Sequence, residues 1–72
     1  MANTADIHFG ETLKRLRKGR GLSQVEFAEL CGISRAYYGR IERGEHSATI
    51  EMCQKIADSI GLHIAELFVD MP

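Results

Sequence analysis

Two short helices joined by a tight turn are the strongest structural signal in the chain, and they span about residues 23–43. Ser23 favours a helix start, and Glu26 three positions later completes a capping box. Apolar residues then recur at close to the helical period as far as Cys31. Gly32 suits the left-handed backbone conformation that ends a helix. The spacing therefore predicts a first helix that ends at a sharp turn.

The second helix follows that turn directly. Ser34 is another good capping residue, and Ile33 with Tyr38 offers a hydrophobic staple that fixes the entry of the chain into the helix. We expect this helix to run to about Arg43 and to stop at Gly44. Two capped helices separated by a glycine-containing turn are typical of a helix-turn-helix unit, whose second helix enters the major groove of DNA.

Four pieces of this segment resemble the Cro/repressor-type (XRE-like) helix-turn-helix family: Ser23-Gln24, Phe27-Ala28, Gly32-Ile33-Ser34-Arg35 and Ile41-Glu42-Arg43-Gly44. The resemblance extends from about Phe9 to Phe68. It implies an all-α protein, a compact five-helix bundle of the lambda-repressor-like DNA-binding type. It also implies a sequence-specific transcriptional regulator that binds double-stranded DNA as a homodimer on a palindromic operator, with autoregulation as one expected role.

Within that family, Arg35 and Tyr37 together with the later Thr49-Ile50 resemble the controller proteins of restriction–modification systems, which are small dimeric autoregulators. Phage-type repressors stay an alternative. Two positions depart from the family pattern. Gly39 stands where a polar side chain is common, which removes a contact, and Ala48 stands where many members have proline.

We expect the whole chain, residues 1–72, to form one domain. A first helix over about residues 7–18 has one apolar face, formed by Phe9, Leu13 and Leu16. A fourth helix begins at a Thr49 cap, ends at Gly61 and has an apolar face formed by Ile50, Cys53, Ile56, Ala57 and Ile60. A short fifth helix is expected over about residues 63–68, with His63 as its cap.

The C-terminal part of the chain, about residues 49–72, carries more apolar residues than one small core readily hides. They include Ile64, Leu67, Phe68 and Val69. We predict that these residues form a homodimer interface, since two-fold symmetric pairs dominate small oligomers. The alternative is that they close the core of a single chain.

The first turn of an inserted helix reaches furthest into the groove, and it supplies the candidates for base contacts. They are Arg35, Ala36 and Tyr37, with Arg40 one turn further on. Arg35 can donate two hydrogen bonds to guanine O6 and N7, and Ala36 can touch a thymine methyl. Tyr37 can pack on sugar and base edges, bond a phosphate or be partly buried, whereas Tyr38 is expected in the core. Arg40 is a candidate for a second base or for a phosphate.

Contacts to the DNA backbone are expected from the starts of the two helices and from the loop after the second one. The candidates are Ser23, Gln24, Ser34, Arg43, His46 and Ser47. The resemblance places Gln24 against the backbone, where a helix N-terminus also offers free amides. Such contacts set the register of a protein on DNA rather than its sequence preference. The resemblance further implies a structural ion pair between Arg17 and Glu42.

The charge of the chain limits how it can bind DNA. The net charge is −1, whereas a DNA-binding domain is normally basic. Residues 1–46 carry eight Lys and Arg against six Asp and Glu, while residues 47–72 carry one Lys against four acidic residues. We therefore expect binding through a few well-placed contacts from two subunits, and not strong non-specific binding.

Little in the sequence favours other chemistry. Cys31 and Cys53 are too sparse for a zinc site, so we expect buried free thiols, no metal and no cofactor. No nucleophile–base pairing is readable, and an enzyme is not expected. The chain has no signal peptide and no membrane-length apolar run, which predicts a cytoplasmic, nucleoid-associated protein. RNA polymerase is a further candidate partner, and the rival function is an antitoxin-like or adaptor module that binds another protein.

Overall fold

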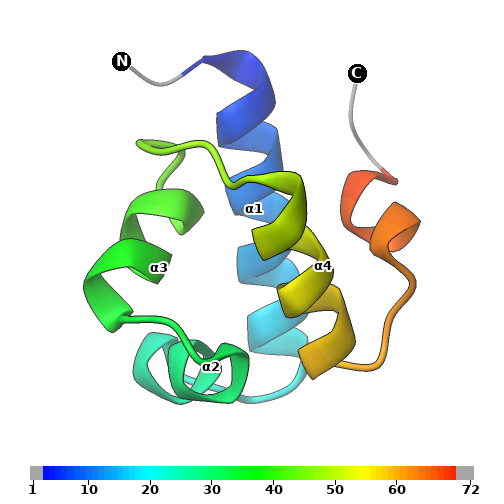
Figure 1. The fold of residues 1–72 in the computed structure, drawn as a ribbon. Helices are drawn as coiled ribbons and strands as arrows, with labels where there is room; N and C mark the ends of the chain where they lie inside the picture. Colours follow the sequence, from blue (N-terminus) through cyan, green and yellow to red (C-terminus); the bar gives the residue numbers. More distant parts are fainter. Residues whose placement is uncertain (1–2, 70–72) are drawn as a thin grey trace.

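The computed structural model describes residues 3–69, which fold into four α-helices and one 3-10 helix without a strand (Figure 1). The helices are α1 (Thr4–Gly19), α2 (Gln24–Cys31), α3 (Arg35–Glu42), α4 (Ile50–Ser59) and the 3-10 helix η1 (Ile64–Phe68). The predicted all-α class is confirmed, and the fifth element is a single short 3-10 segment. Residues 1–2 and 70–72 of the predicted domain lie outside the described residues.

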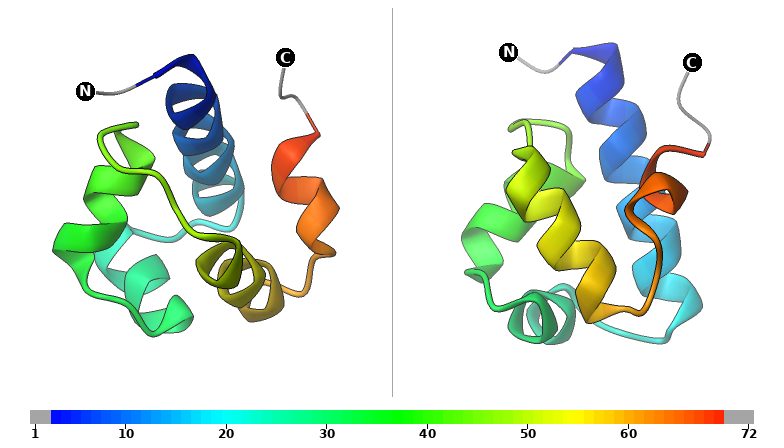
Figure 2. Two further views of the ribbon diagram at one scale, coloured as in Figure 1. Left: turned by 45° about the horizontal axis from the view of Figure 1, so that its top comes forward. Right: turned by 45° about the vertical axis from the view of Figure 1, so that its right-hand side comes forward.

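The helices surround one hydrophobic core. α1 packs against α3 and η1, α2 packs against α3 and α4, and α4 also packs against η1. Figure 2 shows α2 and α3 together on one side of the molecule, with α4 between them and η1. The fully buried side chains come from every element and include Leu13, Phe27, Tyr38, Ile56 and Leu67. None of the helices within residues 3–69 is both long and apolar enough to cross a membrane.

Side-chain caps define where the helices begin. Ser23, Ser34 and Thr49 each accept a hydrogen bond from a backbone N–H in the first turn of α2, α3 and α4, as predicted. His63 caps η1 through Nδ1, which accepts from the Ala65 N–H. The first helix starts earlier than expected, because Asn3 Oδ1 accepts from the Asp6 N–H at 2.8 Å and begins α1 at Thr4.

Two glycines place α3 relative to its neighbours. Gly32 adopts φ 72° in the turn between α2 and α3, a conformation that side chains other than glycine rarely adopt. Gly10 lets α1 approach α3 closely, because a Cβ atom at this position would collide with the backbone carbonyls of Ile41 and Glu42. Gly32 therefore restricts how α3 follows α2, and Gly10 sets how closely α3 packs against α1.

Two predictions about the C-terminal part were wrong. Leu67 was expected at a dimer interface, but its side chain is completely buried among the core residues of the single chain. Ile50 was expected on the buried face of the fourth helix, but it is 73% exposed because it is the first residue of α4 and points away from the core. The other predicted interface residues are accessible: Ile64 is half-buried, Phe68 is partly exposed and stacks on Phe9, and Val69 is 70% exposed.

Candidate nucleic-acid interface

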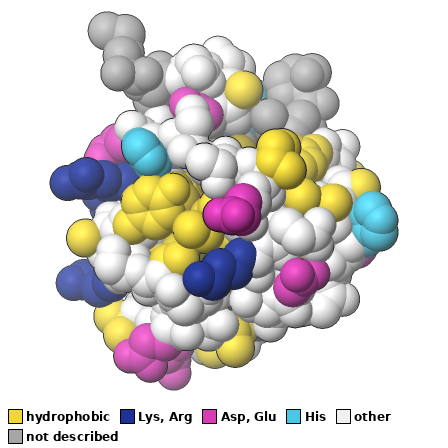
Figure 3. All heavy atoms as spheres, in the orientation of Figure 1, with side chains coloured by type: hydrophobic (Ala, Val, Ile, Leu, Met, Phe, Trp, Pro, Cys, Tyr) yellow, Lys and Arg dark blue, Asp and Glu magenta, His cyan; other side chains and the backbone are white. Residues whose placement is uncertain are grey.

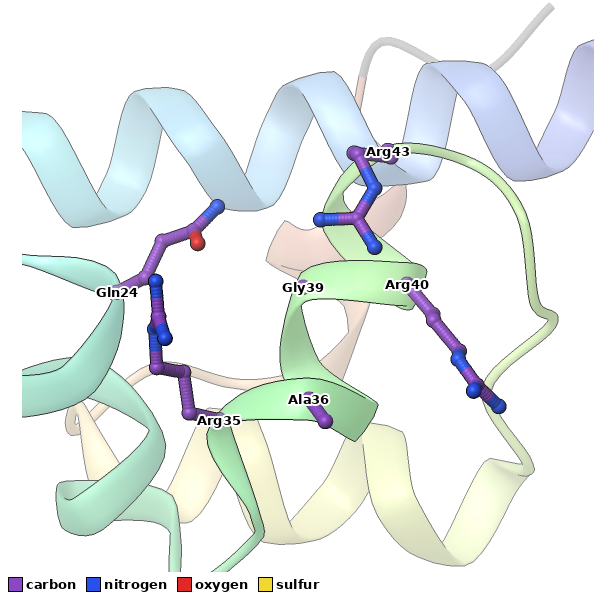
Figure 4. Close-up of a pocket in the computed structure, with 6 residues that line it drawn as sticks. All are labelled: Gln24, Arg35, Ala36, Gly39, Arg40 and Arg43. Atoms are coloured by element: carbon purple, nitrogen blue, oxygen red, sulfur yellow. The ribbon is translucent and has the colours of Figure 1, made fainter.

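The outer face of α3 combines exposed basic side chains with a region free of bulky groups. Arg35, Ala36 and Arg40 are exposed, while Tyr38 and Ile41 on the opposite face are fully buried in the core. A shallow hollow on this outer face is lined by Gln24, Arg35, Ala36, Gly39, Arg40 and Arg43 (Figure 4). Three of the four residues predicted to contact bases therefore share one surface with two of those predicted to contact the backbone.

Arg35 and Arg40 extend from α3 in different directions. Figure 4 shows Arg35 rising from the start of the helix toward Gln24, whereas Arg40 points the opposite way, toward the loop before α4. In the space-filling view, basic side chains lie at the edge of the molecule that α3 forms, and another lies nearer the middle of this face (Figure 3). Hydrophobic side chains gather both beside α3 and over the part formed by α4 and η1. The basic side chains of α3 are thus exposed where the recognition helix is expected, and α1 carries a second exposed basic group with Lys14, Arg15 and Lys18.

Tyr37, the fourth predicted base contact, does not line the hollow. Its side chain is half-buried, and its ring packs edge-on against His46 with 5.2 Å between the ring centroids. This contact joins α3 to the loop that follows it. His46 is exposed, so the pair forms the border of the α3 surface on the side of the loop.

The serine candidates already make contacts within the chain. The hydroxyls of Ser23 and Ser34 accept from the N–H groups of Glu26 and Tyr37, and a hydroxyl that accepts still has a proton to donate. Ser47 differs, because its hydroxyl donates to the carboxylate of Asp6 at 2.7 Å. A phosphate contact from Ser47 would have to replace that bond.

Arg17 and Glu42 form a buried ion pair that ties α1 to α3. Arg17 Nε donates to Glu42 Oε2 at 2.9 Å, and Nη2 donates to Oε1 at 2.8 Å. Arg17 Nη1 also donates to the carbonyl of Leu22, and Gln24 Nε2 donates to Glu42 Oε1 at 3.2 Å. The pair therefore also anchors the start of α2, including the side chain expected on the DNA backbone.

The environment of this pair keeps both groups charged. Burial on its own would raise the pKa of Glu42, but hydrogen bonds from Arg17 and Gln24 more than offset that effect and lower it. The hydrogen bond to Glu42 raises the pKa of Arg17. Burial, together with the nearby Glu42 carboxylate, strongly raises the pKa of the Tyr38 phenol, which stays neutral in the core.

Sequence reasoning missed the role of Glu45. Its carboxylate accepts from Arg43, with 3.0 Å between Arg43 Nε and Oε2 and 3.4 Å between Nη2 and Oε1. The sequence does contain a signal for this contact, because Arg43 and Glu45 carry opposite charges on either side of Gly44. Because Gly44 has φ 76°, the chain turns sharply there and brings the two side chains together.

No group of three or more potential metal-ligating side chains occurs within residues 3–69. Cys31 and Cys53 are buried free thiols, as expected. Burial raises the pKa of both thiols.

The hollow on α3 is lined by the hydrogen-bond donors of Gln24, Arg35, Arg40 and Arg43, with the small residues Ala36 and Gly39 between them. Such a surface can bind anionic and hydrogen-bond-accepting groups.

Comparisons with known proteins agree with this geometry. The control protein C.MunI of Mycoplasma sp is 39% identical over 70 residues, which cover 96% of this chain and 95% of that protein. The crystal structure of the restriction–modification controller protein C.AhdI from Aeromonas hydrophila superposes with a TM-score of 0.87 at 35% identity, covering 92% of this chain and 100% of the other.

The biofilm regulator SinR, solved in complex with DNA, has a TM-score of 0.77 at 28% identity, over 83% of this chain and 97% of the solved chain. Other curated relatives are longer, and the chain spans 40% and 50% of two of them. The model of the helix-turn-helix family HTH_3 matches residues 13–67. The chain belongs to this helix-turn-helix (XRE-like) family.

Proposed function

We propose that the chain is a sequence-specific DNA-binding transcriptional regulator and that α3 is its recognition helix. The observation that carries this proposal is the hollow on the outer face of α3, where Arg35, Ala36 and Arg40 are exposed beside the start of α2. Such a surface presents a bidentate donor for guanine next to a small side chain that permits close approach.

Each candidate residue has a role that its position supports. Arg35, Ala36 and Arg40 face the bases, and Tyr37 contacts sugar or base edges from the border of the hollow. Gln24 contacts a phosphate, because its amide is held at the start of α2 by Glu42 and keeps a second proton to donate. The remaining backbone contacts come from Ser23, Ser34 and His46. Ser47 can join them if its hydroxyl donates to a phosphate in place of the Asp6 carboxylate.

The regulator acts as a homodimer through residues 49–69. Ile50 and Val69, the most exposed large apolar side chains within residues 3–69, would be covered by a second copy together with Phe68 and Ile64. Two copies related by a two-fold axis match half-sites about one helical turn apart. We further propose that it regulates its own promoter, with RNA polymerase as the partner that would be recruited or blocked; the relatives that are named control or controller proteins make a regulatory role the expected one.

The direct test is a selection from a randomised duplex library followed by binding measurements on the selected site. Arg35→Ala is expected to lower affinity for that site by about 1–3 kcal/mol per half-site and to relax its sequence preference. Lys14→Ala, which removes one charge from the exposed face of α1, serves as the control. Unchanged binding by Arg35→Ala would contradict the assignment of α3.

A second candidate is a module that binds another protein, supported by the exposed Ile50 and Val69 beside an acidic C-terminal part. The same selection separates the two functions. If no duplex is enriched at low salt, where phosphate contacts are strongest, the protein-binding function is the correct one.

A further inference from the structure

Arg43 occupies the space that a side chain at position 39 would fill. A Cβ atom added to Gly39 would lie 3.0 Å from Arg43 Nη1 and 3.7 Å from Cζ. Figure 4 shows the side chain of Arg43 starting beyond the end of α3 and reaching back over Gly39, into the hollow that also contains Arg35 and Ala36. The guanidinium therefore lies directly over Gly39, next to the position where a side chain would begin.

Glu45 holds this arrangement through one edge of the guanidinium. The bonds from Nε and Nη2 to the Glu45 carboxylate use the side-on edge of Arg43. A guanidinium has five N–H donors, so Nη1 and the second proton of Nη2 stay available on the end-on edge. Two donors on one edge are what a bidentate pair with O6 and N7 of guanine requires.

We propose that Gly39 and Glu45 are positioning residues that make Arg43 a base-reading side chain with a guanine as its acceptor. This inference rests on the proposed function, because it requires the outer face of α3 to enter the major groove. Arg43 reads a base instead of a phosphate because it folds back over the helix toward Arg35 and Ala36. Holding the planar fork in place before binding also reduces the conformational freedom lost on binding.

Gly39→Ala tests the space over the helix. Alanine raises helix propensity, and the atom it would meet belongs to the flexible end of Arg43, so the variant is expected to fold at least as stably as the wild type. Its affinity for the selected duplex is expected to fall about tenfold, within the range of one bidentate arginine–guanine pair. Gly19→Ala is the matched control, because a Cβ atom at this helical glycine meets nothing within 4 Å.

Glu45→Gln tests whether the ion pair between Glu45 and Arg43 positions the guanidinium, because the two explanations predict opposite changes in DNA affinity. Removing a negative charge near DNA strengthens binding if only electrostatics matter, whereas loss of positioning weakens binding to the selected site. We expect a loss of about twofold to fivefold for the selected duplex, because the side chains of Arg43 and Glu45 are 53% and 55% exposed and an exposed ion pair contributes little. Glu29→Gln, which removes one charge from the exposed surface of α2, is the control. Equal or tighter specific binding by Glu45→Gln would overturn the proposal.

The acceptor is identified by replacing each guanine of the selected duplex with 7-deazaguanine, which lacks N7. At one guanine position, this replacement should lower the affinity of the wild type for the duplex and leave the affinity of Arg43→Ala unchanged. If a methylphosphonate at one phosphate behaves this way instead, Arg43 is a backbone contact and the inference is wrong. Failure of the wild type to select any duplex would overturn the proposed function itself, whereas wild-type-like binding by Gly39→Ala or by Glu45→Gln overturns only this inference.

Discussion

Separating Arg17 from Glu42 is expected to destabilise the fold more than any surface substitution in the helix-turn-helix. Their side chains are 10% and 4% exposed, respectively, so removing either partner leaves a buried charge. Losing one member of such a pair costs about 3–5 kcal/mol. That is a large share of the roughly 4–11 kcal/mol expected for a chain of this length. Arg17→Met also leaves the Leu22 carbonyl without its guanidinium donor.

A double-mutant cycle with Arg17→Met and Glu42→Leu measures the effect. A loss of about 3 kcal/mol corresponds to a fall of roughly 12–24 °C in the melting temperature of a domain this small. The double variant is expected close to the wild type, because a buried ion pair replaced by apolar side chains of similar volume is often neutral. Thermal and urea unfolding followed by far-UV circular dichroism give the four free energies. If the two single losses simply add in the double variant, the reasoning is wrong.

Three further predictions follow from the same structure. The pKa of Glu42 is lowered in the fold, so its ionised carboxylate stabilises the protein at pH values above the ordinary pKa of 4.5. This stability is lost as the pH falls through the folded-state pKa. The free energy of unfolding should therefore fall more steeply with acidification for the wild type than for Glu42→Gln. Gly10→Ala should lower the melting temperature sharply or prevent folding, because its Cβ atom meets the backbone of α3 rather than a movable side chain, and Gly19→Ala should not. Ile50→Asp should shift the chain from dimer to monomer in analytical ultracentrifugation without unfolding it, because Ile50 is 73% exposed; an unchanged dimer would exclude Ile50 from the interface.

Local signals in the sequence predicted most of the fold. Ser23, Ser34 and Thr49 cap helices because their side chains bond to backbone N–H groups only three residues away, so the sequence contains both partners. Asn3 caps α1 by the same chemistry, but it stands before the apolar pattern that marked the helix in the sequence. Its role was therefore missed.

Contacts between distant segments were harder to predict. Leu67 and Val69 are both apolar and close in sequence, yet one is fully buried and the other is 70% exposed. This difference depends on how η1 turns onto α1, which no local pattern encodes. The link between Arg43 and Glu45 and the fit of Arg43 over Gly39 likewise depend on the turn at Gly44, so the sequence identified Arg43 without its orientation.

The outer face of α3 and the start of α2 form the proposed DNA-binding surface. An NMR titration of the wild-type chain with its selected duplex tests this most directly. We expect the largest amide shifts at Gln24, Arg35, Ala36 and Gly39, with little change at Glu11 and Lys14 on the exposed face of α1. Shifts concentrated in α4 and η1, with α3 unaffected, would contradict it.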